Sequence, residues 1–481
     1  MADVVVIGAG IGGLCAAVVL AARGLAVELM EAGAEPGGKA GVVVLEGVEV
    51  DTGPSVLTLP DAFAGVFHDA GALLEEEVQL RALSPAFDYR WPDGSRLLIH
   101  HHLEQSCASV REQLGPAAEE DLRRFLARAR EIWAISRRRF IERPLPTIGE
   151  MFSVQALMEL FRIAPLRTMR GLIHAEVRDP KLRMVLERYA TYNGSDVRVA
   201  PAALACIAEV ELGLGGYGVQ GGIASLVRAL VRVGERLGVR YHYDRPIRRI
   251  DTSGGRITGV QWEGGSLPCD TIVANADVSR VFGELLPAAP QRPPSMSGWT
   301  GVYRARRQAR VGHTILFPAN YEAEFADIFD RHRSPMEPTV YLCAQEPCHG
   351  RVGWAEEEPL FVMANAPAVG EGPEEGEELR ERVHERLLQA GLLDSGDRLL
   401  WHRRPRELEA RFGGRGAIYG ASSNNPFAAF LRPANRVTAY RGLYLASGSA
   451  HPGGGLPLCA WSGRLAAAAV LEDRGLQRRG A

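Results

Sequence analysis

The sequence of 481 residues is about three times as long as a typical single domain, so we expect two domains or one domain with a large insertion. A hydrophobic content of 46%, a charged content of 23% and a net charge of −3 are those of an ordinary globular protein, and they exclude disordered, collagen-like and coiled-coil chains. The near-neutral charge gives no electrostatic attraction for nucleic acid, so no nucleic-acid partner is expected. No apolar run approaches the roughly 18 residues of a membrane-spanning helix.

The chain begins with residues that imitate a signal peptide. Asp3, however, stands where a basic region belongs, and glycines interrupt the apolar stretch. The seven cysteines are scattered without a CxxC pair, which is typical of reduced thiols in a cytosolic protein. We therefore interpret the start as the first folded element and expect a cytoplasmic protein.

Two groups of residues could suggest a metal ion. The triplet His100–His102 has no acid or cysteine at ligand spacing, and Cys343 with Cys348–His349 is followed by no second ligand pair. We therefore expect no metal site.

The first motif is a strand, a glycine turn and a helix. An apolar run from Val4 to Ile7 leads into the turn, and an apolar stretch from Leu14 to Ala22 follows it. The glycines of the turn are Gly8, Gly10, Gly12 and Gly13. In such spacing the first glycine permits the tight turn, the second lets the backbone approach a pyrophosphate, and the last lets the helix pack closely on the strand. The pattern predicts a dinucleotide-binding unit.

A second strand, from Leu25 to Met30, ends at Glu31. A carboxylate at this position would bind a ribose diol, and it would repel the 2′-phosphate of NADP. The nucleotide is therefore expected to be FAD or NAD.

The next motifs separate FAD from NAD. The loop Gly37–Lys39 is followed by the turn Asp51–Ser55. With these motifs the sequence resembles the FAD-dependent amine-oxidase and phytoene-desaturase superfamily. The resemblance implies that Gly38 and Lys39 lie against the cofactor phosphates and that Gly53, Pro54 and Ser55 lie near the flavin ring. The alternative for Lys39 is a solvated loop cation.

Residues 239–277 extend the resemblance. Val239–Val260 predicts strands with hairpin turns at Asp244 and at Ser253–Gly255, and in the resemblance Ile247 supplies a backbone contact to adenine. The stretch Cys269–Asp277 closely matches the Asp-x-Val-Val-x-Asn-Ala-Asp signature of the phytoene-desaturase branch.

The segment Gly442–Leu458 is similar to the part of carotenoid desaturases that wraps the flavin. A helix begins near its end, so backbone N–H groups point at the cofactor and favour the negative charge of a reduced flavin. The implied cofactor contacts are Gly448, Ser449, Gly455, Leu456, Pro457 and Leu458. In the same segment, His451 is a candidate acid–base catalyst because of its pKa range. The alternative is a turn histidine that only bonds the backbone.

The fold class that follows is α/β: a Rossmann-like FAD-binding domain interrupted by an α+β substrate domain. The FAD-binding domain is expected at residues 1–83, 206–286 and 431–481, and the substrate domain at 84–205 and 287–430. This interleaved layout is the one that the superfamily implies.

A membrane-contacting helical part is expected at residues 130–175. Seven arginines lie between Arg137 and Arg170, and an apolar stripe at helical spacing is formed by Val154, Leu157, Met158 and Phe161. Such a helix suits the surface of an anionic membrane, on the inner face of the cell membrane. A core-facing amphipathic helix with a solvated basic face is the alternative.

The motifs Asp51–Ser55 and His451–Leu458 are most similar to those of hydroxycarotenoid 3,4-desaturases, also called methoxyneurosporene dehydrogenases. The resemblance implies a carotenoid substrate, removal of two hydrogens beside a polyene with hydride transfer to FAD, and reoxidation by oxygen or a quinone. The alternatives are a phytoene or diapophytoene desaturase, a carotenoid isomerase or ketolase, an amine oxidase, and a cofactor-free prenyl-binding protein such as the Rab GDP-dissociation inhibitors.

Overall fold

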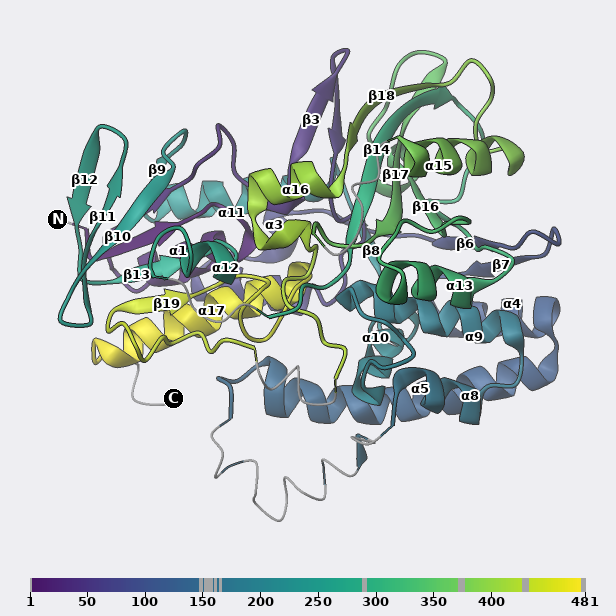
Figure 1. Ribbon diagram of the computed structural model, residues 1–481, viewed down its shortest axis with the longest axis horizontal. Coiled ribbons are helices and arrows are strands. Elements are labelled where there is room, and N and C mark those ends of the chain that lie inside the picture. Colours follow the sequence, from purple (N-terminus) through teal and green to yellow (C-terminus); the bar gives the residue numbers. More distant parts are fainter. Residues whose placement is uncertain are drawn as a thin grey trace.

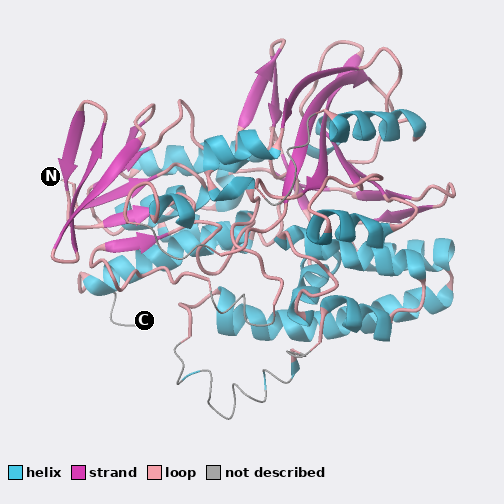
Figure 2. Cartoon of the chain, viewed as in Figure 1, coloured by secondary structure: helices cyan, strands magenta, loops and turns pink. Residues whose placement is uncertain are grey.

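A computed structural model describes residues 2–146, 150, 159, 162–163, 167–287, 292–370, 377–425 and 432–476. Two sheets lie at opposite ends of the molecule, and a group of helices lies below the second sheet in the view of Figures 1 and 2. Most of the stripe 154–161 and much of the expected membrane-contacting part fall outside the described residues. Within the described residues, no helix combines the length and hydropathy needed to cross a membrane.

The first sheet is a five-stranded parallel sheet assembled from the two ends and the middle of the chain. Its order is β19 (Leu443–Leu445), β13 (Ile272–Ala274), β1 (Val4–Ile7), β2 (Val27–Met30) and β9 (Arg240–His242). Four of its strands are short and mostly apolar, as expected for a parallel sheet that is covered on both faces, whereas the edge strand β9 is Arg-Tyr-His and only partly buried.

Helices cover one face of this sheet, and a smaller sheet covers the other. Val4, Val6 and Leu29 share a core with α1 (Ile11–Ala21), α2 (Asp61–Asp69), α11 (Ile223–Arg236) and α17 (Leu456–Asp473). Val5, Ile7 and Met30 instead pack on the antiparallel sheet of β10 (Ile247–Ser253), β11 (Arg256–Trp262) and β12 (Gly265–Pro268). The alternation along β1 and β2 therefore places successive side chains in two separate cores.

One detail of the predicted meander is wrong. Asp244 does not close a hairpin, because β9 pairs in parallel with β2, whereas β10 pairs with β11. Asp244 has a φ of 51°, a left-handed conformation that redirects the chain from one sheet into the next. The hairpin at Ser253–Gly255 is present as predicted.

The second sheet has seven strands. Its order is β18 (Arg398–Arg403), β14 (Ser297–Arg306), β17 (Glu357–Ala366), β16 (Val340–Ala344), β15 (His313–Leu316), β6 (Phe87–Arg90) and β7 (Arg96–Ile99). All its pairs are antiparallel except β15 with β6. Helix α15 (Glu378–Gln389) covers one face through Leu379, Val383 and Leu387. The other face is left for the cavity described below.

Helices of the middle segment form a wall beside this sheet. The longest are α4 (Leu103–Leu114), α5 (Pro116–Ser136), α8 (Met169–Glu176) and α9 (Pro180–Glu187). Helix α9 begins where Asp179 accepts a hydrogen bond from the Leu182 N–H at 2.8 Å and Pro180 takes the first helical position, both common start signals. Shorter elements are the hairpin of β3 (Val42–Leu45) with β4 (Val48–Asp51), the pair of β5 (Leu80–Ala82) with β8 (Tyr217–Val219), and the helices α3 (Leu74–Glu77), α10 (Cys206–Ala208), α12 (Val278–Val281), α13 (Tyr321–Phe325), α14 (Gln345–His349) and α16 (Pro405–Phe412).

The predicted α/β class is confirmed by this mixed architecture. The first sheet and its helices have the topology of a doubly wound dinucleotide-binding unit, in which ligands bind beyond the carboxyl ends of the strands.

Candidate active site

A cavity of about 910 Å³ runs from the carboxyl edge of the five-stranded sheet to the open face of the seven-stranded sheet. This volume is in the upper part of the range of roughly 300–1,000 Å³ for small-molecule and cofactor sites. Almost all of the cofactor residues that the sequence predicted line it. Those that line it are Gly8, Gly10, Gly12, Glu31, Gly38, Lys39, Gly53, Pro54, Ser55, Ile247, Gly448, Ser449, Gly455, Leu456, Pro457 and Leu458.

The glycine turn lies against the ends of two neighbouring strands. A methyl group on Gly12 would come within 1.9 Å of the Ala446 carbonyl oxygen, and one on Gly13 within 2.1 Å of the Gly8 carbonyl oxygen. Gly10 faces the Asn275 side chain, which would be 2.5 Å from a methyl group there. Only glycine fits these contacts, so the backbone stays open to a pyrophosphate, and the residues present fit a dinucleotide.

Glu31 lies at the end of β2, where it borders the cavity. Its carboxylate accepts hydrogen bonds from the N–H groups of Ala9 at 2.6 Å and Gly33 at 2.8 Å. These two bonds hold the side chain over the glycine turn, and each oxygen has a further lone pair for a ribose hydroxyl.

Lys39 connects the two ends of the cavity. Its ammonium donates to the backbone carbonyl oxygens of Ala417 at 2.8 Å and Ile418 at 3.0 Å, and burial lowers its pKa. The resemblance implied a phosphate contact for this residue, whereas in the structure the side chain fastens the glycine loop to a segment 378 residues further along the chain. Lys39 was expected to be either a phosphate ligand or a solvated cation, and this bond to the backbone was not predicted.

The turn after β4 packs directly on this loop. A methyl group on Gly53 would lie 1.9 Å from the Lys39 carbonyl oxygen, so the flavin-side turn and the glycine loop approach each other as closely as backbones can. Ser55 and Pro54 then face the cavity.

The N-terminus of α17 opens into the cavity at Gly455, and no side chain caps it. Its unpaired N–H groups and the helix dipole favour negative charge at this place. A flavin ring that becomes anionic on reduction fits such a donor set.

His451 is buried at the rim of the cavity. Its Nε2 lies 2.7 Å from the Arg143 carbonyl oxygen, so this nitrogen carries the proton, and burial lowers the pKa of the imidazole. His451 is therefore neutral at pH 7 and tied to the backbone. This geometry favours the turn-histidine interpretation over acid–base catalysis.

The far end of the cavity is formed by side chains that the sequence motifs did not reveal. Thr300, Met363 and Tyr341 are cross-strand neighbours on the open face of the seven-stranded sheet. Apolar side chains of the helical wall face the cavity: Trp133, Phe140, Leu145 and Ile163. Four carboxylates line the cavity, and all of them belong to segments beside the five-stranded sheet: Glu31, Glu35, Asp277 and Glu284.

Two buried arginines were also missed. Arg432 donates to the carbonyl oxygens of Gly448 at 3.1 Å and Tyr419 at 3.3 Å, and burial lowers its pKa to about 10. Arg188 lies among tyrosines. Arg188 begins the stretch Arg188–Ser195, which resembles a motif of the bacterial carotenoid desaturases, but that resemblance gave the arginine no role. Arg432 stands in no such motif, so sequence reasoning had no signal for it.

The cysteines that the sequence left without a second ligand pair have a distant partner. His313, 35 residues before Cys348, brings Nε2 within 3.5 Å of the Cys348 sulfur, and the Cys343 sulfur lies 3.9 Å from His349 Nε2. Among the described residues, His313, Cys343 and Cys348 are the group whose ligand atoms, all within 4.8 Å of one another, could hold a metal ion. Their contacts are those of buried thiol–imidazole hydrogen bonds.

A parallel sheet with a glycine turn, a terminal acid and an open cavity at its carboxyl edge defines a dinucleotide-dependent enzyme. Comparison with known proteins identifies the family: residues 11–300 match the model of the flavin-containing amine oxidoreductases. The chain belongs to this family. It is an FAD-dependent oxidoreductase, as predicted.

Several curated relatives are similar over nearly the whole chain. A hydroxyneurosporene desaturase of Rhodobacter capsulatus is 36% identical, with 98% of each chain covered. A 1-hydroxycarotenoid 3,4-desaturase of a Flavobacterium species is 31% identical, with 97% of this chain and 98% of the relative covered. Among solved structures, putrescine oxidase has a TM-score of 0.64 at 14% identity, covering 98% of this chain and 99% of its own, which supports the fold.

Proposed function

We propose that this enzyme is a carotenoid desaturase that introduces a C=C bond beside a polyene, by 3,4-desaturation of a 1-hydroxycarotenoid. The observation that carries the proposal is one continuous cavity, which extends from the glycine turn to apolar side chains of the seven-stranded sheet and of the helices beside it. An elongated hydrocarbon can lie against Met363, Phe361 and Trp133 while one of its bonds reaches the cofactor. The names of the relatives supply the substrate class.

The bound flavin supplies an acceptor for a hydride from carbon. The chain's own residues position the substrate and exclude water, which is the main task when the departing charge spreads into a polyene. The carboxylates that line the cavity lie beside the five-stranded sheet. No described carboxylate therefore lines the cavity at the open face of the seven-stranded sheet, where it could act as a base. The uncapped N-terminus of α17 stabilises negative charge on the cofactor.

The cofactor contacts proposed are the residues that the sequence predicted, with Glu31 on a ribose and Ile247 beside the adenine. Lys39 borders the site, and its main role is proposed to be the bond to Ala417 and Ile418. Gly13 packs against the turn and does not face the cofactor, since a Cβ atom at this position would overlap the Gly8 carbonyl oxygen. The domains proposed are 1–83 with 206–286 and 431–481 for FAD, and 84–205 with 287–430 for the substrate.

A peripheral contact with the inner face of the cell membrane is part of the proposal. Phe140, Ile141 and Leu145 line the cavity and belong to the segment expected to contact lipid, so a substrate could pass from a bilayer through this wall. Arg137, Arg138 and Arg139 are paired with carboxylates, which reduces the positive charge available to anionic lipid. Flotation with anionic vesicles tests the contact, and failure to float would remove it. Oxygen or a quinone is proposed as the electron acceptor.

Expression in bacteria that make phytoene, neurosporene or hydroxyneurosporene tests the function. We expect the hydroxylated polyene to lose two hydrogens at the 3,4 position and the others to react poorly. A gain of no double bond on any of the three would contradict desaturation, and a gain only on phytoene would move the enzyme to a sister activity.

A further inference from the structure

An arginine without a polar partner lines the cavity. Arg403, the last residue of β18, is only 8% exposed. Its guanidinium carbon lies 4.8 Å from the centre of the Trp401 ring and 5.7 Å from that of the Phe412 ring. Among the described residues, none accepts a hydrogen bond from this guanidinium or forms an ion pair with it. Its nitrogen atoms are unpaired but not sealed off, so a ligand in the cavity can reach them.

A second arginine lies beside the first. Arg411, on α16, also lines the cavity, and its guanidinium carbon lies 5.3 Å from the centre of the same Phe412 ring. Burial, and after it the charge of Arg411, lowers the pKa of Arg403 to about 10, so Arg403 is still charged at pH 7. Glu407 offsets part of this effect, but its carboxylate accepts from Arg404 at 2.6 Å. Two like charges are therefore held together without a described carboxylate between them.

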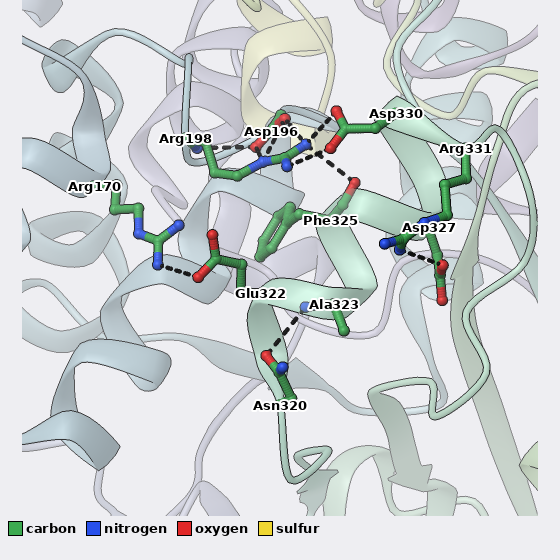
Figure 3. Close-up of polar contacts among 10 residues, drawn as sticks. All are labelled: Arg170, Asp196, Arg198, Asn320, Glu322, Ala323, Phe325, Asp327, Asp330 and Arg331. Atoms are coloured by element: carbon green, nitrogen blue, oxygen red, sulfur yellow. Dashed lines mark hydrogen bonds and ion pairs between the residues drawn. The ribbon is translucent and has the colours of Figure 1, made fainter.

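Arginines of similarly low exposure elsewhere in the chain have acceptors. The side chain of Arg310 is 4% exposed and pairs with Glu358 at 2.7 Å. Figure 3 shows Arg198 between the carboxylates of Asp196 and Asp330, to which it donates at 2.7 and 2.8 Å. Burying a charge is costly unless it is paired and hydrogen-bonded. A buried guanidinium that is open to a cavity and has no such acceptor indicates an anion supplied by a ligand.

The arginine pair lies on the nucleotide side of the cavity. Just after α16, methyl groups on Gly413 and Gly414 would lie 3.5 Å from Arg280 Cβ and 2.9 Å from an Asp277 carboxylate oxygen. Arg280 also donates to the Arg411 carbonyl oxygen at 3.0 Å. Both partners follow β13, which pairs with β1, the strand that leads into the glycine turn. Helix α16 therefore packs beside the dinucleotide end.

A dinucleotide brings negative charge on both phosphates of its diphosphate. The glycine turn offers backbone N–H groups but no cation. Two other cations that line the cavity are already engaged, since Lys39 donates to carbonyl oxygens and Arg280 pairs with Glu284 at 2.8 Å. Arg403 and Arg411 have no described acceptor, and the planar guanidinium group binds phosphate oxygens in pairs.

We propose that Arg403 and Arg411 bind the diphosphate of FAD, in addition to the glycine turn. The cofactor follows from the family, so the inference does not depend on the carotenoid substrate. The rings of Trp401 and Phe412 hold the Arg403 guanidinium in place before the ligand arrives. In the chain without FAD the two arginines repel each other, and the diphosphate provides the counter-charge that the fold itself lacks.

The variant Arg403→Met tests this, since it keeps a long apolar side chain beside the rings and removes the charge. Arg403→Lys keeps the charge and loses the planar fork. The matched control is Arg304→Met: the Arg304 guanidinium carbon also lies 4.8 Å from a ring centre, that of Trp354, but it pairs with Glu46 and Glu357 and does not line the cavity.

The affinity for FAD is measured from the recovery of flavin fluorescence when the holoenzyme is diluted. We expect Arg403→Met to raise the Kd about tenfold and to weaken the dependence of Kd on salt, Arg403→Lys to lie between, and Arg304→Met to match the wild type. An unchanged affinity in Arg403→Met would overturn the inference.

ADP-ribose carries the same diphosphate without a flavin. As a competitor of FAD, it should lose affinity for Arg403→Met by about the same factor as FAD. If FAD alone binds more weakly while ADP-ribose binds as before, the arginine acts on the flavin and the assignment to the diphosphate is wrong.

The stability of the full chain freed of FAD separates a ligand site from a structural role. Because Arg403 has no counter-charge in that state, Arg403→Met should unfold at the temperature of the wild type or higher, whereas at saturating FAD the wild type should be the more stable. Arg304→Met should gain as much from FAD as the wild type. A lower unfolding temperature of FAD-free Arg403→Met would assign the arginine a structural role and contradict the proposal.

A carboxylate on a substrate is the other possible anion. The holoenzyme is titrated with a polyene that ends in a carboxyl group and with the corresponding hydrocarbon, and the diphosphate proposal predicts the same relative affinity in the wild type and in Arg403→Met. A preference for the carboxylate that is lost in Arg403→Met, with the FAD affinity unchanged, would show a substrate site and overturn the inference.

Discussion

The two ends of the cavity are built in different ways. At the nucleotide end, Gly8, Gly12 and Glu31 lie within one strand, turn, helix and strand, and their roles follow from backbone contacts over short stretches of sequence. At the substrate end, Tyr89, Arg188 and Tyr341 come from three separate segments and meet only in the folded protein.

Because the nucleotide end is built from local backbone contacts and the substrate end from distant side chains, the two ends tolerate different kinds of substitution. The nucleotide end depends on the absence of side chains, so a single methyl group is enough to damage it. The substrate end depends on the presence of particular polar atoms, so changes there should alter selectivity while the protein still folds and holds its flavin.

The largest effect is expected for Gly12→Ala. In an ordinary helix this change would stabilise by about 1 kcal/mol, but here the new methyl group would lie 1.9 Å from the Ala446 carbonyl oxygen. We expect destabilisation of about 3 kcal/mol and loss of bound flavin, measured by thermal unfolding and by the flavin absorbance of the purified protein. Gly396→Ala is the control, because nothing lies within 4 Å of a methyl group there. A Gly12→Ala protein with full flavin content and wild-type stability would contradict the close contact.

Lys39→Met tests the bond that joins the two ends. Removing the ammonium leaves the carbonyl groups of Ala417 and Ile418 without their donor, so we expect a loss of about 1.5–3 kcal/mol and faster amide exchange near residue 418. Lys181→Met is the matched control, since Lys181 pairs with the exposed Asp93 and solvent screens such a pair, so its loss should change stability much less.

The same variant distinguishes a tether from a phosphate ligand. If Lys39 acts mainly on the cofactor phosphates, Lys39→Met will lose FAD affinity while the stability of the flavin-free protein stays unchanged. The bonds to Ala417 and Ile418 instead predict that Lys39→Met lowers the stability of the flavin-free protein more than it lowers the affinity for FAD.

A smaller effect is expected for His451→Gln. Gln can replace the Nε2 donor to the Arg143 carbonyl oxygen, so we expect flavin content to be kept and the desaturation rate to change by no more than about threefold, whereas loss of a general acid–base catalyst costs about 10²–10⁴ in rate. A hundredfold loss of rate with full flavin content would restore His451 as a catalyst.

The pH dependence of stability provides a second readout at this residue. Because burial lowers the pKa of His451, the unfolded state binds a proton more readily than the folded state. Its contribution to stability is therefore fully present above the ordinary histidine pKa of about 6.5 and is lost as the pH falls from that value through the lower pKa of the folded state. In His451→Gln this part of the acid sensitivity should be absent, as measured by unfolding temperature between neutral and acidic pH.

The nucleotide end could be predicted from the sequence because its physics is local. A glycine at position 12, an acid at position 31 and a helix start near Pro457 are each required by the element in which they stand. The α/β class and a dinucleotide followed from such local patterns, whereas the choice of FAD over NAD followed from the resemblance at Gly37–Lys39 and Asp51–Ser55. Both the class and the cofactor were confirmed.

The substrate end could not be predicted in the same way. The charge balance of Arg188 depends on contacts with Tyr89 and, through Tyr192, with Glu211. The stretch Arg188–Ser195 resembles a family motif, but the resemblance does not say which distant residues the arginine meets. Asp244 shows the same limit on a smaller scale, since its left-handed turn could close a hairpin or redirect the chain, and only the pairing of β9 with β2 decides. His313 likewise reaches the cysteines only through the pairing of β15 with β16.

The most direct test of the account is the anaerobic reaction of the purified holoenzyme with a 1-hydroxycarotenoid. The oxidised flavin absorbance should disappear in a single turnover, with one new C=C bond at the 3,4 position for each flavin reduced. A flavin that stays oxidised in the presence of bound hydroxylated polyene, or that is bleached by an amine instead, would contradict the account.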